Sequence, residues 1–320
     1  MLPRILIALA AALTAASAFA QGYPTKPVRV VVTFPPGGTP DIYGRIMSVE
    51  LSKLWGQSVV VENRTGAGGT IGTDYAAKSA PDGYTLLFAA DASVTIAPHL
   101  YAKLPYDPVR DFAPVVNVTA GPFVLMANPA FPPNNVKELI ALVRSQPGKI
   151  SYASSGAGGQ QHLAMESIRT MAGNMDMIHV PYKGFGQGLA DVLANQVPLI
   201  FGGITASIQL TRSGKLKALG VTGPRRAKAL PDVPAIAETL PGFDITAWYG
   251  FLAPAGTPRE IVKKIHDDSV AIVHRKDFLE RLDRDGIEPV GNTPEEFAAE
   301  IKRDIGRWEK IVKAAGVKPE

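Results

Sequence analysis

Two glycine-rich loops carry groups that could bind an anion. In the first, an apolar segment predicts a buried strand over 28–34, and Pro35-Pro36-Gly37-Gly38 follows. A helix is then predicted to start near Thr39 to Asp41, with apolar residues at helical spacing over 41–54. The first backbone N–H groups of a helix lack partners within it, and the helix dipole adds about half a positive charge there. Because glycine lets a ligand approach the backbone closely, such a loop can bind an anion without a charged side chain. The simpler interpretation of this loop alone is a tight turn that Asp41 caps.

The second loop repeats this layout. A strand predicted over 150–153 leads into Ser154-Ser155-Gly156-Ala157-Gly158-Gly159, and a helix is predicted over 161–171. Two helix N-termini that face each other across a cleft would bind a small dianion, whereas a flexible loop is the alternative. His162, at the start of the second helix, is expected to brace the loop or to face a ligand.

The sequence argues against several kinds of catalytic and cofactor site. It contains no cysteine, which excludes cysteine nucleophiles, thiolate metal sites and iron–sulfur clusters. Its five histidines lack zinc-binding spacing, and "NRTGAGGTIG" departs from a dinucleotide fingerprint at Ile71. No serine lies in G-x-S-x-G, so a secreted hydrolase that uses Ser154 or Ser155 with His162 is an unfavoured alternative. We predict no enzyme, no metal and no cofactor.

The elements that must position these loops alternate between strands and helices. Short β-branched or aromatic segments are interspersed with helical spacing at 136–145, 161–171 and 188–194, which predicts an α/β fold with mostly parallel sheets flanked by helices. Two proline-punctuated crossings predict a discontinuous domain I over 21–122 plus 221–320 and a domain II over 123–220. Thr293, Pro294 and Glu296 predict a capped helix near the C-terminus, which ends at Gly316.

The first residues have the pattern of an export signal. Arg4 is followed by an apolar run of about 14 residues, too short to span a membrane, and by Ala18-Phe19-Ala20. We expect residues 1–20 to be a signal peptide that is cleaved after Ala20. Without a cysteine for lipid attachment, the exported protein is expected to be free in the periplasm. The formal net charge of +4 is small and dispersed, and its densest patch, "GPRRAKAL", is interpreted as a solvated loop and not as a nucleic-acid site.

The motifs together resemble a known family. The segments "VRVVVTFPPGGTPD", "VVVENRTGAGGTIG", "APDGYTLLFA", "LPYDPVRDFAPV", "YASSGAGGQQHLAMES", "HVPYKG" and "WYGFLAPAGTP" occur in order and are similar to those of the Bug receptors. These are extracytoplasmic solute receptors of the tripartite tricarboxylate transporter type, and the resemblance covers nearly all of the chain after the signal peptide. It implies a two-domain periplasmic binding protein of the type II-like flytrap class that closes on a small carboxylate. The expected partners are that ligand, a di- or tricarboxylate or an aromatic acid, and a membrane permease, and the receptor is expected to be a monomer. A receptor that signals without transport would bind alike and stays an alternative.

The resemblance also implies the ligand-binding residues. Phe34 would pack against the ligand, while the first loop would build an anion and water site and a second loop of the same domain would add to it. The opposite jaw and the cleft lining would come from domain II. The full set is Phe34, Gly37, Gly38, Thr39, Asp41, Ala90, Asp91, Ser93, Ser154, Ser155, Gly156, Gly184, Phe185 and Gly186.

Two departures from the family bear on the ligand. Many members carry an Asp after the strand that reads "VPLIF" here, whereas this chain has Gly202-Gly203. An ammonium-bearing ligand would favour an acid there, so amino acids are disfavoured, although Asp91 could replace it. Phe185 stands where smaller residues are common, which would narrow the pocket or stack on an aromatic acid.

Overall fold

The computed structural model describes residues 22–317, so the predicted signal peptide and its cleavage after Ala20 lie outside the described residues. The strands are β1 (Val28–Val32), β2 (Val59–Asn63), β3 (Thr85–Ala90), β4 (Phe112–Ala127), β5 (Ser151–Ser154), β6 (Ile178–Pro181), β7 (Leu199–Gly203), β8 (Lys217–Val221), β9 (Thr246–Pro254) and β10 (Glu288–Pro289). The helices are α2 (Thr39–Trp55), α3 (Thr70–Ala77), α4 (Ala97–Leu100), α5 (Val136–Ser145), α6 (Gln160–Met171), α7 (Phe185–Leu193), α8 (Ile204–Arg212), α9 (Arg259–Val273), α10 (Lys276–Asp285) and α11 (Pro294–Ala314). Short helical turns are η1 (Ala67–Gly69), η2 (Ala92–Ile96) and η3 (Ile236–Glu238).

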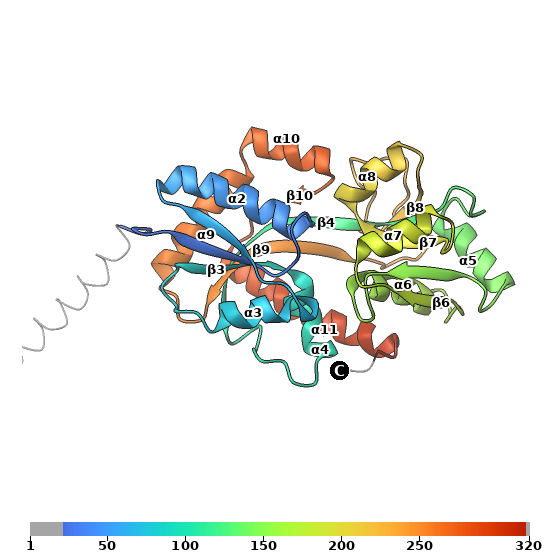
Figure 1. Ribbon diagram of the computed structural model, residues 1–320, viewed down its shortest axis with the longest axis horizontal. Helices are drawn as coiled ribbons and strands as arrows, with labels where there is room; N and C mark the ends of the chain where they lie inside the picture. The colour runs from blue at the N-terminus through green and yellow to red at the C-terminus, as the bar shows by residue number, and fades with distance from the viewer. Residues whose placement is uncertain (1–21, 318–320) are drawn as a thin grey trace, which may run out of the picture.

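The strands form one continuous path in the order β2-β1-β3-β9-β4-β7-β5-β6, and β8 and β10 also pair with β4. β1 pairs in parallel with β2 and β3, and β5 pairs in parallel with β6 and β7. β4 and β9 run antiparallel to their neighbours and extend between two halves of the molecule (Figure 1). The predicted α/β class is confirmed, and the sheet is mixed because the crossing strands reverse direction.

Each half has its own part of the sheet. We call β1, β2, β3, β9, β10 and the start of β4 the first half, and the end of β4 with β5 to β8 the second half. β4 leaves the first half at Pro122, which pairs with Thr246, and enters the second at Phe123, which pairs with Gly203. Val221 bridges Ala235, so the return crossing lies near Thr222 and Ile245. The domain limits at 122/123 and 220/221 stay a prediction. The bridge between Val221 and Ala235 favours a return of the chain to the first half later than residue 221.

Local sequence explains most element boundaries. Val28, Val30, Val31 and Val32 of β1 are buried, as expected of a strand covered on both faces. α2 begins at Thr39, at the early end of its predicted start, because Pro40 has the fixed φ that suits a first helical turn. α7 begins three residues before its predicted start, where Gly186 and Gly188 weaken the helical signal.

The capped C-terminal helix is confirmed. The Thr293 side chain accepts a bond from the Glu296 N–H, and the Glu296 carboxylate accepts one from the Thr293 N–H, which closes a capping box. Trp308 of α11 is fully buried. α11 packs against β4 and η2 and also against α6, so it connects the two halves on one side of the molecule.

Candidate functional site

Five of the described α-helices begin at glycine N-caps that make no side-chain cap bond. One of them, α3 at Gly69, is preceded by the turn η1, and the other four follow a strand with no helical turn between. These are α2 at Gly38, α6 at Gly159, α7 at Gly184 and α8 at Gly203. Each follows the carboxyl end of a parallel strand, the edge at which open α/β sheets bind ligands. By contrast, α5 and α11 carry the side-chain caps Asn135 and Thr293. The uncapped helices therefore leave backbone N–H groups free for an anion.

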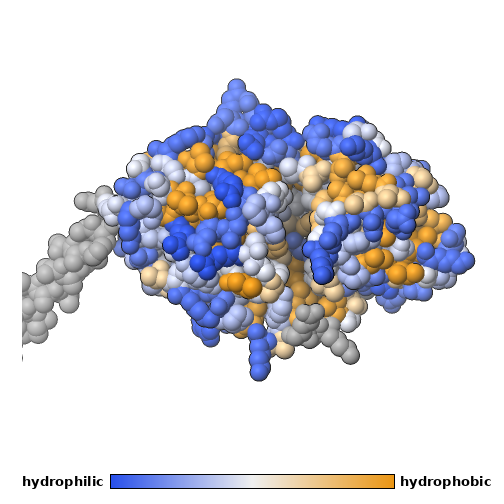
Figure 2. All heavy atoms as spheres, viewed as in Figure 1, coloured by the Kyte–Doolittle hydropathy of each residue, from blue (hydrophilic) through white to orange (hydrophobic). Residues whose placement is uncertain are grey.

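Contacts between the two halves bring these N-termini together. A Cβ added at Gly203 would lie 3.7 Å from the Thr39 hydroxyl oxygen, so α8 and α2 start beside each other. The Gln160 side-chain amide of α6 donates a hydrogen bond of 2.7 Å to Asp91, which follows β3. The molecular surface is furrowed between the halves (Figure 2). The site is thus assembled from four helix starts that are distant in sequence.

The first loop is held in shape by Asp41. One carboxylate oxygen accepts a bond of 3.0 Å from the Gly37 N–H, and the other accepts bonds of 2.9 Å from Arg45 and 2.8 Å from Asn63. Asn63 also donates to the Phe34 carbonyl. Burial acts to raise the pKa of Asp41, but the hydrogen bonds from Arg45, Gly37 and Asn63 outweigh it and hold that pKa below its usual value. Asp41 is thus a buried brace of the loop, and Gly37, with a φ of +86°, needs the freedom of glycine.

The second loop of the first half is more deeply buried. Asp91 and Ser93 are fully buried, and the Ser93 hydroxyl donates back to the Ala90 carbonyl at 3.3 Å. One carboxylate oxygen of Asp91 has no hydrogen-bond partner, and neither does the buried Thr33 hydroxyl. Burial and then the nearby Asp304 carboxylate raise the pKa of Asp91 to about 8. Ser93 is therefore committed to internal bonding, whereas Asp91 is left half-satisfied at the junction of the halves.

The loop of the second half rests on a buried pair of histidines. The rings of His162 and His179 stack at 3.9 Å, with an angle of 7° between their planes. The Ser154 hydroxyl donates to the Gly156 carbonyl at 3.0 Å and lies 2.6 Å from Nε2 of His179, which therefore donates to it. Nδ1 of His162 accepts the Gly158 N–H at 3.0 Å. Both rings are thus assigned as neutral with the proton on Nε2.

This arrangement changes the predicted roles of the loop residues. Ser154 is bonded to His179 and not to His162, so the serine–histidine pair of the hydrolase alternative is not formed. The exposed Ser155 uses its N–H and hydroxyl to bond the Gln161 side chain at 2.9 and 2.6 Å. Gly156 has a φ of +134° and is the member of this group that requires glycine.

Acid is expected to destabilise this loop. Burial and then His162 lower the pKa of His179 to about 4, and burial lowers that of His162. The stabilisation by these neutral rings is complete above a pH of about 6.5, the pKa of histidine in the unfolded chain. It is lost as the pH falls towards 4. Unfolding measured from pH 7.5 to 4 should therefore show a flatter pH slope in His179→Gln than in the natural protein. His274→Gln, at an exposed position, is the control, and an unchanged slope in His179→Gln would contradict the assignment.

Phe185 and Gly202 lie against each other in the second half. A Cβ added at Gly202 would lie 2.7 Å from Met126 Cε, 2.8 Å from the Ser207 hydroxyl and 3.0 Å from Phe185 Cζ. The Phe185 ring thus covers Gly202. Gly184 is half-buried and has a φ of +152°, whereas Gly186 is exposed.

Gly202→Ala is expected to lower the free energy of unfolding by about 1 kcal/mol, because the added methyl overpacks this contact. Thermal melting should show the loss, and Phe185→Ala in the same chain should recover part of it. If Phe185→Ala restores no stability, the contacts of the added methyl group with Met126 and Ser207 alone account for the loss.

Several residues of this region were not among the predicted site residues. Gln160, Asn63, Arg45, His179 and Tyr249 all bond to or adjoin predicted residues. Gln160 and Asn63 could have been noted, since each is a polar residue at the end of a predicted strand or start of a helix. Tyr249 could not, because its place beside Thr39 depends on the crossing strand β9.

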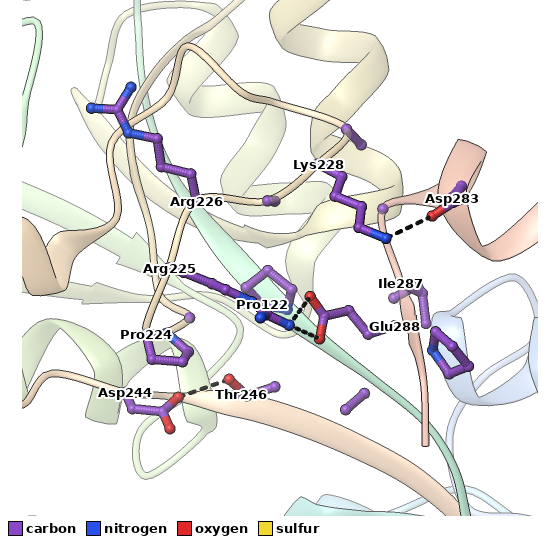
Figure 3. Close-up of a pocket in the computed structure, with 16 residues that line it drawn as sticks. Pro122, Pro224, Arg225, Arg226, Lys228, Asp244, Thr246, Asp283, Ile287 and Glu288 are labelled. Atoms are coloured by element: carbon purple, nitrogen blue, oxygen red, sulfur yellow. Dashed lines mark hydrogen bonds and ion pairs between the residues drawn. The ribbon is translucent and has the colours of Figure 1, made fainter. Parts of the chain in front are cut away.

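A cavity of about 710 Å³ lies between the loop after β8 and the α10–β10 segment (Figure 3). Of the four helix starts it adjoins that of α8, since a Cβ added at its lining residue Gly286 would lie 2.9 Å from Ile204. It contains the predicted basic patch, whose side chains pair with acids: Arg225 with Glu288 at 3.1 Å, Arg226 with Glu238 at 2.8 Å and Lys228 with Asp283 at 3.8 Å. These pairs are exposed to solvent, and the acids offset the positive charge of the patch. The cavity therefore offers no concentrated positive surface.

Residues 22–317 contain neither a membrane-spanning helix nor a metal-binding cluster. No helix there has the length and apolar character of a membrane span. No cluster of three or more His, Cys, Asp or Glu side chains in that range could hold a metal ion.

Known proteins resemble this chain in sequence and in fold. The chain is 36% identical over 317 residues to Protein BugT of Bordetella pertussis, covering 98% of this chain and 96% of that one. A solved structure of Rpa4515 from R. palustris with adipate shares 34% identity and a TM-score of 0.85, covering 93% of this chain and 100% of that one. MatC from Rhodopseudomonas palustris with bound malate shares 33% identity and a TM-score of 0.80, covering 91% and 100%.

The match to a family model covers most of the sequence. The model described as "Tripartite tricarboxylate transporter family receptor" matches residues 44–317. The predicted Bug resemblance and the periplasmic binding protein fold are thus confirmed. The chain belongs to the tripartite tricarboxylate transporter family of receptors.

Proposed function

We propose that this protein is a periplasmic receptor that captures a small carboxylate between its two halves and delivers it to a membrane permease of the tripartite tricarboxylate type. One observation carries the proposal: four helices with uncapped glycine N-termini start at the same furrow. A carboxylate there would accept hydrogen bonds from backbone N–H groups, favoured by the helix dipoles. Two relatives with about one third identity hold adipate and malate, which supports a carboxylate ligand here.

The proposed binding set is narrower than the predicted one. Gly38, Thr39, Gly184 and Phe185 stand at or beside helix starts and are proposed to contact the ligand. Phe34, Gly37, Ser155 and Gly156 lie in the neighbouring loops, and Gly186 lies in the first turn of α7. Asp41 and Ser154 are proposed to act indirectly, by holding the loops that carry these groups. Ala90 and Ser93 are buried beneath the site and are proposed to support Asp91.

Export is part of the proposal. We propose that residues 1–20 are removed after Ala20 and that the remaining chain works as a monomer without a lipid anchor, catalytic activity or cofactor. Mass spectrometry of protein recovered from the periplasm would give the N-terminal residue. Cross-linking in membranes would distinguish a permease partner from a signalling partner.

Thermal melting of refolded protein against a panel of carboxylates tests the ligand. A ligand at about 100 times its dissociation constant adds roughly 2.7 kcal/mol, which should raise the midpoint by several degrees. The panel should hold adipate, malate, benzoate and an amino acid such as aspartate. A shift with one class identifies that class, whereas no shift with any carboxylate would contradict the proposal for these acids.

A further inference from the structure

We propose that Asp91 takes up a proton when the furrow closes, so that ligand capture by this receptor is coupled to proton uptake. The inference rests on the proposed function, because it assumes that the two halves move apart and close on a ligand. It adds a role for one acid that neither the family nor the anion site requires. Asp91 acts here as a positioning residue of the closed state.

The geometry at Asp91 is that of a neutral carboxyl group. The side chain is fully buried at the end of β3, where one oxygen accepts a bond of 2.7 Å from Gln160 and the other has no partner. An ionised carboxylate with an orphaned oxygen pays a large desolvation cost. A protonated carboxyl group keeps one oxygen as the acceptor for Gln160 and leaves an unpaired neutral hydroxyl at the other, which costs less to bury than an unpaired ionic oxygen.

The charged groups around Asp91 do not offset this cost. From α11, Asp304 disfavours a second negative charge and Arg307 favours it, and the repulsion from Asp304 is the larger effect. From α6 the Gln160 amide donates to Asp91 and favours its charged form, and from β9 the facing group is the hydroxyl of Tyr249, whose pKa burial raises above its usual value. The backbone of Ala92 also favours the charged form, but weakly. Burial and Asp304 together raise the pKa of Asp91 to about 8, in agreement with a neutral side chain at pH 7.

Closure controls this burial because Gln160 belongs to the other half. Separation of α6 from η2 would admit water to Asp91 and so remove the desolvation that is the largest cause of its raised pKa. Loss of the Gln160 bond acts the other way, but water can replace that donor, so the pKa of Asp91 would return towards the ordinary value of about 3.9. At a pH between the two pKa values of Asp91, closure of the furrow therefore takes up close to one proton. Ligand affinity should therefore fall by up to tenfold for each unit that pH rises between about 5 and 7.

A locked protein tests the protonation without any ligand. The chain has no cysteine, and Thr39 lies 3.7 Å from the Cβ position of Gly203, so Thr39→Cys with Gly203→Cys allows a disulfide across the furrow. Carboxyl ¹³C NMR of aspartate-labelled protein should show one carboxyl that titrates near pH 8 in the oxidised form and near 4 in the reduced form. Asp91→Asn should remove that resonance, and Asp304→Asn should lower its pKa. Asp41 is the internal control that stays ionised.

Two results would overturn the inference. One is an Asp91 carboxyl that titrates near 4 in the oxidised protein, and the other is a carboxyl that titrates alike in both forms. If adipate or malate binds, calorimetry in phosphate and Tris at pH 7 should give close to one proton taken up per ligand, and none with Asp91→Asn. Absence of heat with both acids would count against those acids as ligands, while the locked protein would still decide the protonation.

Discussion

Gly38→Val is expected to reduce carboxylate affinity by more than 100-fold, about 3 kcal/mol, while the protein stays folded. The φ of −76° and ψ of 161° at Gly38 suit valine, and an added Cβ would meet only Pro35 O at 3.6 Å and Pro40 Cδ at 3.7 Å. The branched side chain would stand over the first N–H groups of α2, where the ligand is proposed to lie. Calorimetry with the acid found by the melting panel, together with a thermal melt of the free variant, measures both effects.

Gly306→Val is the matched control, since a Cβ at that position meets nothing within 4 Å and the residue lies on α11, away from the helix starts. It should bind like the natural protein. If Gly38→Val also kept its affinity, the N-terminus of α2 would not be part of the ligand site.

Asp41→Ala is expected to lower the free energy of unfolding by about 3 kcal/mol and to weaken ligand binding. The carboxylate accepts bonds from the Gly37 N–H, Arg45 and Asn63, and its loss would leave these donors unsatisfied in a largely buried place. Because hydrogen bonds lower the pKa of Asp41 despite its burial, its contribution is present above pH 4 and is lost as pH falls through that lowered value. Thermal melting at pH 7 and pH 3 should therefore show a smaller difference between variant and natural protein at pH 3.

Asp267→Ala provides the comparison. Asp267 pairs with Lys263 at the same four-residue spacing on a helix, but half of its side chain is exposed, so its removal should cost less than 1 kcal/mol. An equal cost for the two variants would mean that Asp41 is no more than a surface partner of Arg45.

The local layout of the site could be predicted because short continuous segments of the sequence determine it. Strand, glycine loop and helix follow one another at 28–54 and at 150–171, and periodicity with glycine and proline signals is enough to recognise them. The start of α7 was misplaced by three residues, since glycine in a first turn weakens the apolar pattern of a helix. Comparison with relatives confirmed the family and the fold class but did not test the individual site residues.

The roles of particular side chains could not be predicted in the same way. Ser154 has a histidine eight positions away in the sequence, yet it bonds to His179, because parallel pairing of β5 with β6 places Tyr152 beside His179. The sequence left Asp91 as a possible partner for an ammonium group. The structure instead buries Asp91 near Asp304, and burial and then that carboxylate raise its pKa, although a hydrogen bond from Gln160 acts in the opposite direction.

The sequence by itself determined the α/β alternation and the helices that follow glycine-rich loops, since these features depend on residues within one turn or one strand. The order of its motifs, taken together, identified the receptor family. Only the tertiary structure decided which helix starts share the furrow and which side chains brace them. Thr39 meets Gly203, and Asp91 meets Gln160, because β4 and β9 carry the chain between the halves and align their edges. Such contacts join residues far apart in the chain, and no local preference of the backbone encodes them.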